Sequence, residues 1–478
     1  MNTQPAMMPV LVVDLDGTLL RSDMLYESLW SAFGQDWLAP VRAGRALLGG
    51  KAALKTYLSG RSDVDVTTLP YDEAVISYVR DWREKGGRTA LVSATDQALV
   101  DRVGAHLGIF DVLQGSDGKT NLKGARKAAY LDQTFGAKSY AYMGDSQADL
   151  AVWKNAAQAV VVNASAAVQA QAARLDVPME TISDPTSRSK AYVKALRPHQ
   201  WLKNILVFLP MLTAHQLSTG NLLLSLLAFV AFCLIASSVY VLNDLMDLKS
   251  DRAHPRKRLR PFAAGDIPIA HGTWMAGGLL LAGAGLSILL GPLFALTMAV
   301  YYLATLAYSI NLKRRAVVDI CVLAGLYTMR IVAGGAATGI TLSVWLLAFS
   351  IFFFFSLAAI KRQAELVDMA SRGKLDVSGR GYSVDDLQII PMMALGAGYV
   401  SILIMALYVN TPTVVELYST PAMLWGISCV LLYWISRLVL VTHRGHMHDD
   451  PVVYAAKDRM SQICGLLIFG FAVLGAII

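Results

Sequence analysis

The stretch "LLLSLLAFVAFCLIASSVYVLNDLMDLKSDRAHPRKRLRP", residues 222–261, changes abruptly from apolar to highly charged. Residues 222–242 contain no charged side chain, which is the length and composition of a helix that crosses a membrane. Three aspartates follow, Asp244, Asp247 and Asp251, and after them a dense run of Lys and Arg. The stretch therefore predicts a helix that ends at a membrane surface, with charges of both signs at its end.

The composition divides the chain near residue 190. Hydrophobic residues make up 55% of the whole and charged residues only 16%. Residues 1–190 contain 20 Lys and Arg against 21 Asp and Glu, whereas the remainder contains 22 against 14. The first part has the balance of a soluble domain, and the second has the sparse, clustered charges of a membrane domain. We predict a soluble domain at 1–180, a linker at 181–196 and a membrane domain at 197–478.

Nine apolar segments predict nine membrane-spanning helices in an all-α domain. They lie at roughly 203–219, 221–242, 272–291, 293–310, 317–338, 342–360, 389–409, 422–441 and 461–478. Lys and Arg cluster in the gaps after even-numbered segments and are missing from the gaps after odd-numbered ones. The positive-inside rule then predicts a multi-pass protein of the bacterial inner membrane with its N-terminal domain in the cytoplasm. The N-terminus lacks a basic region before a long apolar run, so we expect no cleaved signal peptide.

The soluble part alternates strand-like and helix-like pieces. The runs "VLVVDLDG", "TALVSAT", "YAYMGD" and "AVVVNAS" are short and rich in β-branched residues, and helical stretches separate them. This alternation predicts a Rossmann-like α/β fold, with a parallel sheet covered on both faces. A helical insert at about 22–80 is expected to form a small cap outside the sheet.

The end of the first strand carries the acidic motif "VVDLDGTLL". Asp14 and Asp16 follow the strand directly, and Gly17 and Thr18 make the turn. Carboxylates two residues apart can hold one Mg²⁺ and leave a carboxylate oxygen free to attack phosphorus. In the same way, "LVSATD" places a hydroxyl at the end of another strand, that of Ser93 or, as the less favoured choice, Thr95.

Two further motifs complete this set. "NLKGARKAAY" places Lys123 at the start of a helix, where it can neutralise a phosphoryl group, and "MGDSQADL" adds Asp145 and Asp149 as oxygen ligands. All of these residues follow strands, and parallel sheets bind ligands at the carboxyl ends of their strands.

The four motifs, in this order, resemble the haloacid dehalogenase superfamily of phosphohydrolases over about residues 9–170. The resemblance implies that Asp14 is the nucleophile and forms an aspartyl-phosphate, and that Asp16 is the general acid and base. It also implies that Ser93 and Lys123 hold the phosphate, and that Asp14, Asp16, Asp145 and Asp149 bind Mg²⁺. A folded but inactive regulatory domain is the alternative.

The aspartates of the opening stretch lie on one face if the helix continues through them. Asp244, Asp247 and Asp251 fall within about 60° of one another at 100° per residue. A carboxylate costs about 3 kcal/mol at the centre of a bilayer, so these side chains belong at the helix end. Three carboxylates on one stripe predict a Mg²⁺ site suited to an anionic ligand such as a diphosphate.

Other charged residues lie at the ends of the apolar segments or within them. Arg256, Lys257, Arg258 and Arg260 fit topology and lipid-headgroup contacts on one interpretation and phosphate binding on another. Asp319 and Arg330 share a helix face, so they either line a cavity or pair with each other. The motif "HRGHMHDD" (443–450) suggests a transition metal, but we favour a solvated loop.

Nine spans, "NDxxDxxxD" after the second and a polar cluster after the sixth resemble the UbiA superfamily of intramembrane transferases over about residues 190–478. Aromatic prenyltransferases of that superfamily carry a second motif, DxxxD, after the sixth span, and here that position reads "KRQAELVDM". "RPHQWLKN", "NDLMDLKSDRAHPRKRLRPFAAG", "YSINLKRRAVVDI" and "KRQAEL" are instead similar to the branch that makes decaprenyl-phosphate phosphoribose.

This resemblance implies a phosphoribosyl transfer that uses Mg²⁺, with phosphoribosyl diphosphate as donor and a polyprenyl phosphate as acceptor. Asp244, Asp247 and Asp251 would act in catalysis through the metal. The residues expected to bind phosphate are Lys203, Arg256, Arg260, Lys313, Arg330 and Lys361. The residues expected to bind other parts of the substrates are Asn243, Tyr308, Asp319 and Glu365.

Several alternatives stay open at this stage. An aromatic prenyltransferase that uses a polyprenyl diphosphate is the main one, with the phosphatase domain acting on another phosphate or in regulation. A transport or scaffold protein explains the spans but not the three aspartates. We expect no nucleic-acid partner, and an oligomer remains open. The soluble domain is expected to hydrolyse the ribose 5-phosphate of the transferase product.

Overall fold

The computed structural model describes residues 8–36, 38–117, 121–183, 188–373, 381–447 and 450–477. These residues group into two compact units. The first unit is Met1–Leu196 together with Tyr240–Ala276, and the second is Arg197–Val239 together with Gly277–Ile478. The segment that contains the three aspartates therefore belongs to the same compact unit as the soluble domain.

The soluble domain is built on a parallel sheet of six strands in the order β3-β2-β1-β4-β5-β6. The strands are β1 (Val10–Val13), β2 (Thr89–Asp96), β3 (Val112–Ser116), β4 (Tyr140–Gly144), β5 (Gln158–Val162) and β6 (Met179–Ile182). Val12 of the central β1 pairs with Ala90 on one side and with Tyr142 on the other. Most central-strand residues are buried, because helices cover both faces.

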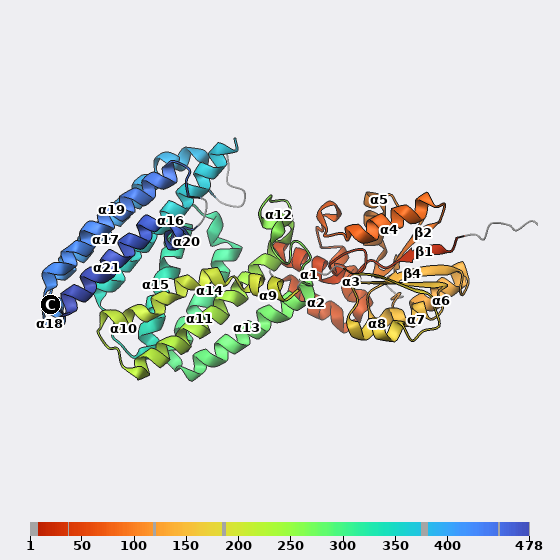
Figure 1. Cartoon of the computed structure of the whole chain (residues 1–478), viewed down its shortest axis with the longest axis horizontal. Helices are drawn as coiled ribbons and strands as arrows, with labels where there is room; N and C mark the ends of the chain where they lie inside the picture. The colour runs from red at the N-terminus through yellow and green to blue at the C-terminus, as the bar shows by residue number, and fades with distance from the viewer. Residues whose placement is uncertain are drawn as a thin grey trace, which may run out of the picture. The chain divides into compact units, whose positions relative to one another are not determined.

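Each face of the sheet has its own helices and its own core. The helices α4 (Glu73–Glu84) and α5 (Gln97–Leu107) pack on one face, against Leu11 and Leu91. The helices α6 (Ala125–Phe135), α7 (Leu150–Trp153) and α8 (Ala166–Ala172) lie on the other face (Figure 1). The predicted parallel α/β architecture is confirmed.

The insert between β1 and α4 is helical, as the sequence indicates. It contains α1 (Met24–Gln35), α2 (Ala39–Leu48), α3 (Lys51–Ser59) and the short 3₁₀ helix η1 (Val66–Thr68). Asp23 caps α1 by accepting hydrogen bonds from the backbone N–H groups of Leu25 and Tyr26. The predicted linker at 181–196 contains the helix α9 (Arg188–Leu196), and residues 184–187 lie outside the described residues.

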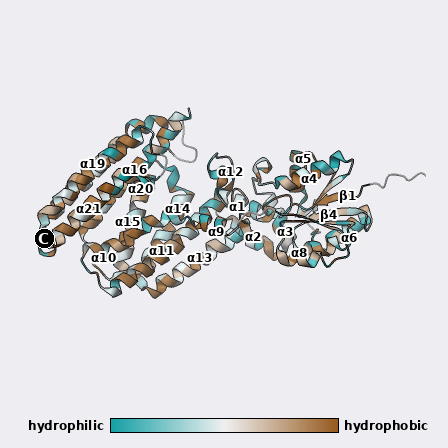
Figure 2. Ribbon diagram, in the orientation of Figure 1, coloured by the Kyte–Doolittle hydropathy of each residue, from teal (hydrophilic) through white to brown (hydrophobic). Residues whose placement is uncertain are grey.

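In the described residues, eight helical segments are long and apolar enough to cross a membrane, one fewer than the nine predicted (Figure 2). The predicted segment at 203–219 forms the 3₁₀ helix η3 (Pro198–Phe208) and the five-residue α10 (Leu209–Thr213). Pro210 lies in the first turn of α10, where its ring is tolerated, and the helix ends soon after it. The first predicted span is therefore not one long helix.

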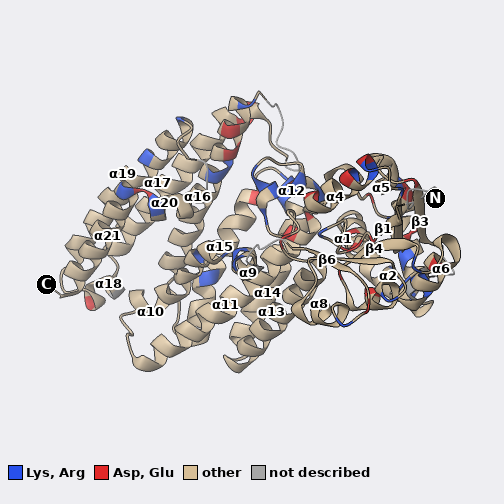
Figure 3. Cartoon of the chain, turned by 45° about the vertical axis from the view of Figure 1, so that its right-hand side comes forward, with Lys and Arg blue, Asp and Glu red and all other residues tan. Residues whose placement is uncertain are grey.

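The other long helices agree with the predicted segments in number and order. They are α11 (Thr219–Met246), α13 (Ile269–Leu289), α14 (Pro292–Ile310), α15 (Val318–Thr338), α16 (Val344–Ser371), α17 (Ile390–Val409), α19 (Leu424–His443) and α21 (Arg459–Ile477). Shorter pieces between them are α12 (Leu248–Arg252), η4 (Lys257–Leu259), η5 (Leu312–Arg314), η6 (Val384–Gln388), α18 (Pro412–Leu417), η7 (Pro421–Met423) and α20 (Pro451–Lys457). Lys and Arg gather around α12 (Figure 3).

Candidate active sites

The first site lies at the carboxyl end of β1, the central strand of the sheet. Asp14 follows β1 directly, and its Oδ1 accepts a hydrogen bond from the backbone N–H of Leu15 at 2.8 Å. Asp16 lies two residues further on, and its Oδ1 accepts from the backbone N–H of Met24 at 2.8 Å. The neighbours β2 and β4 carry the other motifs, so the parallel sheet brings all of them to one edge.

A buried lysine that the sequence analysis did not select pairs with Asp14. Lys127 of α6 places its Nζ 2.8 Å from Asp14 Oδ2 and donates to the Tyr142 hydroxyl at 2.9 Å. Its side chain is 3% exposed. The predicted Lys123 lies two residues before α6 begins and is exposed. The geometry therefore makes Lys127 the cation that faces the candidate nucleophile.

The hydroxyl motif of β2 divides its two members between different tasks. Ser93 is fully buried, and its Oγ accepts from the backbone N–H of Thr95 at 3.1 Å. Thr95 donates its own hydroxyl to Asp16 Oδ2 at 2.7 Å. The less favoured of the two hydroxyls is thus the one that contacts the candidate acid–base residue.

Asp145 and Asp149 both lie at the end of β4, but in different surroundings. Asp149 is buried and already accepts hydrogen bonds from Tyr142, Ser146 and the backbone N–H of Asp145. Asp145 accepts a long hydrogen bond, 3.4 Å, from Thr18. Gly17 has a φ of +78°, and a Cβ on it would lie 2.4 Å from Asp145 Oδ2. Glycine is required there both by conformation and by space.

Burial and like charges raise the pKa values of the acidic residues at this edge. Burial raises the pKa of Asp14 to about 6 against the opposing effect of Lys127, and Asp149 raises it further. Burial and the nearby Asp23 raise the pKa of Asp16 to about 6. Burial, together with the charges of Asp149 and Asp14, raises the pKa of Asp145 to about 8. These carboxyl groups resist ionisation because they are buried close to one another. A divalent cation that binds among them would stabilise their ionised forms.

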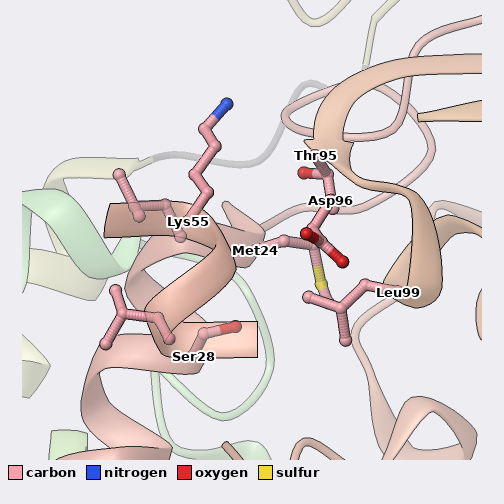
Figure 4. A pocket seen from close by; sticks show the side chains of 8 residues that line it. Met24, Ser28, Lys55, Thr95, Asp96 and Leu99 are labelled. Carbon is pink, nitrogen blue, oxygen red and sulfur yellow. The ribbon is translucent and has the colours of Figure 1, made fainter. Parts of the chain in front are cut away.

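A small pocket opens between the insert and the sheet (Figure 4), and two of the residues that line it, Met24 and Thr95, donate hydrogen bonds to Asp16. Met24, Leu25, Ser28, Lys55 and Leu58 of the insert line it on one side; Thr95, Asp96 and Leu99 complete it. Lys55 Nζ donates to the Ala94 carbonyl at 2.5 Å, and burial lowers the pKa of Lys55. The insert thus supplies a basic side chain that is hydrogen-bonded to the end of β2.

The second site begins at the end of α11, in the opening stretch of the sequence. Asp244 and Asp251 are 2% and 1% exposed, and Arg260 donates to both of them, at 3.1 and 2.6 Å. The helix breaks at Asp247, which precedes α12, but the backbone N–H of Asp251 still bonds to the Asp247 carbonyl. Asp244 and Asp251 are therefore joined across the break by Arg260, one of the predicted phosphate ligands.

A buried group of basic residues lies in the second compact unit. Lys203 of η3 and Lys361 of α16 approach Asp450 Oδ2 at 2.7 and 3.2 Å. Tyr327 donates to the same carboxylate at 3.3 Å. Burial alone would raise the pKa of Asp450, but Lys361 and Lys203 hold it well below its usual range. The prediction of a solvated loop at 443–450 is wrong for Asp450, because its carboxylate forms ion pairs with two lysines inside the protein. His448 and Asp449 lie outside the described residues.

Arg330 extends this group inside the helices. Its Nε donates to Asn204 Oδ1 at 3.0 Å, and its guanidinium lies over the rings of Phe232, Tyr301 and Tyr327. Cation–π contacts of this kind stabilise a buried guanidinium without neutralising it. Arg330 also donates to the Leu326 carbonyl, so an amide, a carbonyl and three aromatic rings hold its guanidinium in place.

A second buried network surrounds Asp319. Arg362 Nε lies 2.5 Å from Asp319 Oδ2, with side chains 1% and 0% exposed, and Tyr382 donates to Asp319 Oδ1 at 2.5 Å. Arg362 also pairs with Glu365 and donates to the Tyr308 hydroxyl. Three predicted substrate ligands, Tyr308, Asp319 and Glu365, are thus brought together, with Arg362 as their common partner. Lys313 and Arg256 are more accessible.

Comparisons with known proteins identify both parts of the chain. Residues 204–463 match the UbiA prenyltransferase family, and residues 11–154 match haloacid dehalogenase-like hydrolases. The chain belongs to the UbiA prenyltransferase family. Its N-terminal part is a haloacid dehalogenase-like phosphatase domain, and both families are enzymes.

Three relatives are similar to the UbiA-family chain at 34–40% identity. A protein named y4nM from Sinorhizobium fredii is 39% identical over 461 residues, which cover 96% of this chain and 89% of that one. The nodulation protein NoeC of Azorhizobium caulinodans is 40% identical over 275 residues, 57% of this chain and 89% of that one. Decaprenyl-phosphate phosphoribosyltransferase of Mycolicibacterium smegmatis is 34% identical over 299 residues, 61% of this chain and 93% of that one.

The aspartate segment of the UbiA-family domain offers two buried oxygens that a divalent cation would satisfy. Both families depend on Mg²⁺ in general. Asn243 Oδ1 and Asp251 Oδ1 are buried and have no hydrogen-bond partner, so a ligand beside the stripe would satisfy two orphaned oxygens. As the side chains stand, no three His, Cys, Asp or Glu in the described residues form a cluster close enough to hold a metal. Lys127 and Arg260 take carboxylate oxygens at the two sites instead.

The sequence analysis missed Lys127, Arg362, Tyr382 and Asp450 as members of these sites. For two of them a signal was present. Lys127 follows Lys123 by one helical turn on the same predicted helix. Asp450 precedes Pro451 and caps α20, a pattern that marks a helix start. For Tyr382, and for the pairing of Arg362 with Asp319, the partner is distant in sequence and no local pattern indicates it; only the pairing of Arg362 with Glu365 is local.

Proposed function

We propose that the UbiA-family domain transfers the 5-phosphoribosyl group from phosphoribosyl diphosphate to a polyprenyl phosphate. We also propose that the phosphatase domain removes the ribose 5-phosphate from the product. The observation that carries the first step is a pair of basic residues in the C-terminal half of α16, at the position where aromatic prenyltransferases have a second aspartate motif. Lys361 and Arg362 stand there, with Lys203 and Arg330 nearby in the same unit. The similarity to decaprenyl-phosphate phosphoribosyltransferase supports the same donor and acceptor.

In this transfer the substrates carry three anionic groups: the diphosphate, the ribose 5-phosphate and the lipid phosphate. An oxygen of the lipid phosphate attacks C1 of the ribose, the bond from C1 to the diphosphate oxygen breaks, and diphosphate leaves. Asp244, Asp247 and Asp251 would hold Mg²⁺, which neutralises the diphosphate. Lys203, Arg330 and Lys361 bind and orient phosphate oxygens, because hydrogen bonds fix all three in place; Lys203 and Arg330 are buried and Lys361 is partly exposed.

The second step follows from the residues at the end of β1. Asp14 Oδ attacks the phosphorus of the 5-phosphate, and Asp16 gives a proton to the departing ribose 5-oxygen. Water then attacks the aspartyl-phosphate, with Asp16 taking its proton, and inorganic phosphate leaves. Lys127 fits the role of holding the charge of the phosphoryl group, and Asp14, Asp16 and Asp145 would hold Mg²⁺. The raised pKa of Asp16, about 6, suits a group that must give and take a proton near neutral pH.

We place the chain in the bacterial inner membrane with the phosphatase domain in the cytoplasm. The alternation of Lys and Arg between successive gaps supports this orientation. Phosphoribosyl diphosphate is highly charged, so it stays in the cytoplasm and does not cross the bilayer. A donor site and a phosphatase on the same side would therefore act on one product in sequence.

The test uses the full chain in nanodiscs with labelled phosphoribosyl diphosphate, decaprenyl phosphate and Mg²⁺. The wild type is expected to produce ribosylated lipid without a ribose phosphate. Asp14→Asn is expected to accumulate the phosphoribosyl lipid, and Asp244→Asn to make neither product. Asp81→Asn and Asp266→Asn are matched controls, because both are exposed carboxylates of the same compact unit.

Two results would contradict the proposal. Transfer from a prenyl diphosphate to an aromatic acid, without transfer of phosphoribose, would make the chain an aromatic prenyltransferase. Normal transfer with the phosphoribosyl lipid left intact by the wild type would separate the phosphatase from the product of its neighbour.

A further inference from the structure

A buried ion pair joins the aspartate segment to the cap of the phosphatase domain. Arg252, which follows Asp251 in α12, donates two hydrogen bonds to Glu27 of α1, at 3.1 Å to Oε2 and 2.7 Å to Oε1. The two side chains are 6% and 4% exposed. Both residues belong to the first compact unit, although 225 positions separate them in the sequence. A bidentate, desolvated pair of this kind fixes orientation as well as distance.

On the phosphatase side, Glu27 is tied to the loop that carries the catalytic carboxylates. Ser22 donates its hydroxyl to Glu27 Oε1 at 2.6 Å, and the Ser22 carbonyl accepts from the backbone N–H of Gly17 at 3.1 Å. One turn before Glu27, the backbone N–H of Met24 holds Asp16. The first turn of α1 therefore holds the acid–base residue and the ion pair together.

On the transferase side, Arg252 is held by the segment that carries the aspartates. Its Nε donates to the Ala263 carbonyl at 3.2 Å, so its guanidinium bridges the two ends of the loop around η4. The residue before it, Asp251, shares Arg260 with Asp244. A shift of Arg252 would move Asp251, because the two are consecutive residues of a five-residue helix.

Other contacts show that the surfaces are closely fitted around this pair. Trp30 of α1 donates its indole N–H to Thr273 Oγ1 at 3.0 Å. Gly265 has a φ of +75°, and a Cβ on it would lie 2.8 Å from the Cβ of Arg21. At the edge of the same contact, Lys249 pairs with Asp63, and both side chains are more than half exposed.

We propose that Glu27 and Arg252 are positioning residues that hold the metal-binding carboxylates of both active sites on one frame. The proposal rests on the proposed function for the identity of the two reactions. Removing either partner leaves the other charged and buried, so the contact loosens from both sides. Glu27 thereby affects the transferase and Arg252 affects the phosphatase, although neither touches the substrate of the reaction that it affects.

The test compares Glu27→Gln, Arg252→Met, the conservative Arg252→Lys and the exchanged pair Glu27→Arg with Arg252→Glu, all in the full chain in nanodiscs. The probes are phosphoribosyl transfer and hydrolysis of p-nitrophenyl phosphate, each titrated with Mg²⁺. Glu27→Gln is expected to raise the half-saturating Mg²⁺ of the transfer by roughly 2- to 30-fold, the range for loss of a coupling residue. Arg252→Met is expected to do the same for p-nitrophenyl phosphate hydrolysis, and Arg252→Lys to recover part of it.

The exposed pair is the matched control. Lys249→Met and Asp63→Asn remove a similar charge from the edge of the same contact, and both should leave the Mg²⁺ titrations unchanged. Hydrogen exchange at the amides of α12 gives a readout that needs neither activity, and Glu27→Gln should speed it. The exchanged pair keeps the test valid if the single variants fold poorly.

The outcomes separate this inference from the proposed function. A wild type that hydrolyses p-nitrophenyl phosphate but transfers no phosphoribose contradicts the proposed function, whereas the effect of Arg252→Met on hydrolysis and the exchange of α12 still test the frame. The frame is overturned if Glu27→Gln leaves the exchange of α12 as in the wild type, or if Arg252→Met leaves the Mg²⁺ titration of hydrolysis unchanged.

Discussion

Substitution by methionine is expected to affect phosphatase activity at Lys127 but not at Lys123. Lys127 is buried and lies 2.8 Å from the proposed nucleophile Asp14, while Lys123 is exposed and lies before α6. The pKa of Asp14 is about 6 with Lys127 in place. Loss of an adjacent opposite charge raises a carboxyl pKa by about 1–3 units, so Lys127→Met should raise the pKa of Asp14 to about 7–9.

The size of the effect follows from the ionised fraction of Asp14. At pH 7 a group with a pKa of about 6 is about 90% ionised, and at a pKa of about 8 it is about 10% ionised. Lys127→Met should therefore lower kcat/KM for p-nitrophenyl phosphate at pH 7 by about tenfold through this effect alone. The loss should shrink as the pH rises toward 9, because Asp14 then ionises without help.

The assay is a pH profile of p-nitrophenyl phosphate hydrolysis by the wild type, Lys127→Met and Lys123→Met at fixed Mg²⁺. Methionine is close to lysine in length, and the Tyr142 hydroxyl keeps its bond to Asp149, so the local packing is preserved. The reasoning is refuted if Lys123→Met shifts the acidic limb of the profile and Lys127→Met does not.

Three other expectations follow from the same sites. Gly17→Ala should abolish phosphatase activity and spare the transfer, since the left-handed backbone costs about 1–2 kcal/mol and the new Cβ would strike Asp145; parallel assays of both reactions check it. Asp450→Asn should lower the stability of the chain by about 3–5 kcal/mol, because Lys203 and Lys361 lose their buried partner; thermal unfolding against the exposed control Asp266→Asn measures it. The pKa of Asp145 is raised from 3.8 to about 8, so without Mg²⁺ the native state keeps a proton that the unfolded chain has lost. The free energy of unfolding should therefore fall as the pH rises through this range, and binding of Mg²⁺ should release protons. Calorimetry in two buffers of different ionisation enthalpy would detect that release.

The fold and the motif residues could be predicted because their signals are local. The run "VLVVDLDG" and its counterparts show strands by composition, and apolar segments of about twenty residues show spans by length. The same reasoning failed at 203–219, where the apolar count is high but the chain forms the 3₁₀ helix η3 and the five-residue α10, with Pro210 in the first turn of α10. It selected Lys123 and not Lys127. Lys123 lies two residues before α6 begins, whereas Lys127 lies within α6 beside Asp14, and composition does not fix a helix boundary that closely.

The basic run after the aspartates shows why charges are harder to interpret than apolar residues. In the sequence, the bases near α12 appear equally available to lipid headgroups, to substrate phosphates and to the positive-inside rule. Two of them are committed to carboxylates instead: Arg252 to Glu27, and Arg260 to Asp244 and Asp251. Each still counts as a positive charge for topology, because that rule counts Lys and Arg whatever their partners. The number of bases free to bind phosphate, however, falls with every such pair, and only tertiary structure shows which ones form. Lys203 and Lys361, far away in the sequence, are paired with Asp450 in the same way, so a substrate phosphate bound there would have to replace that carboxylate as their partner.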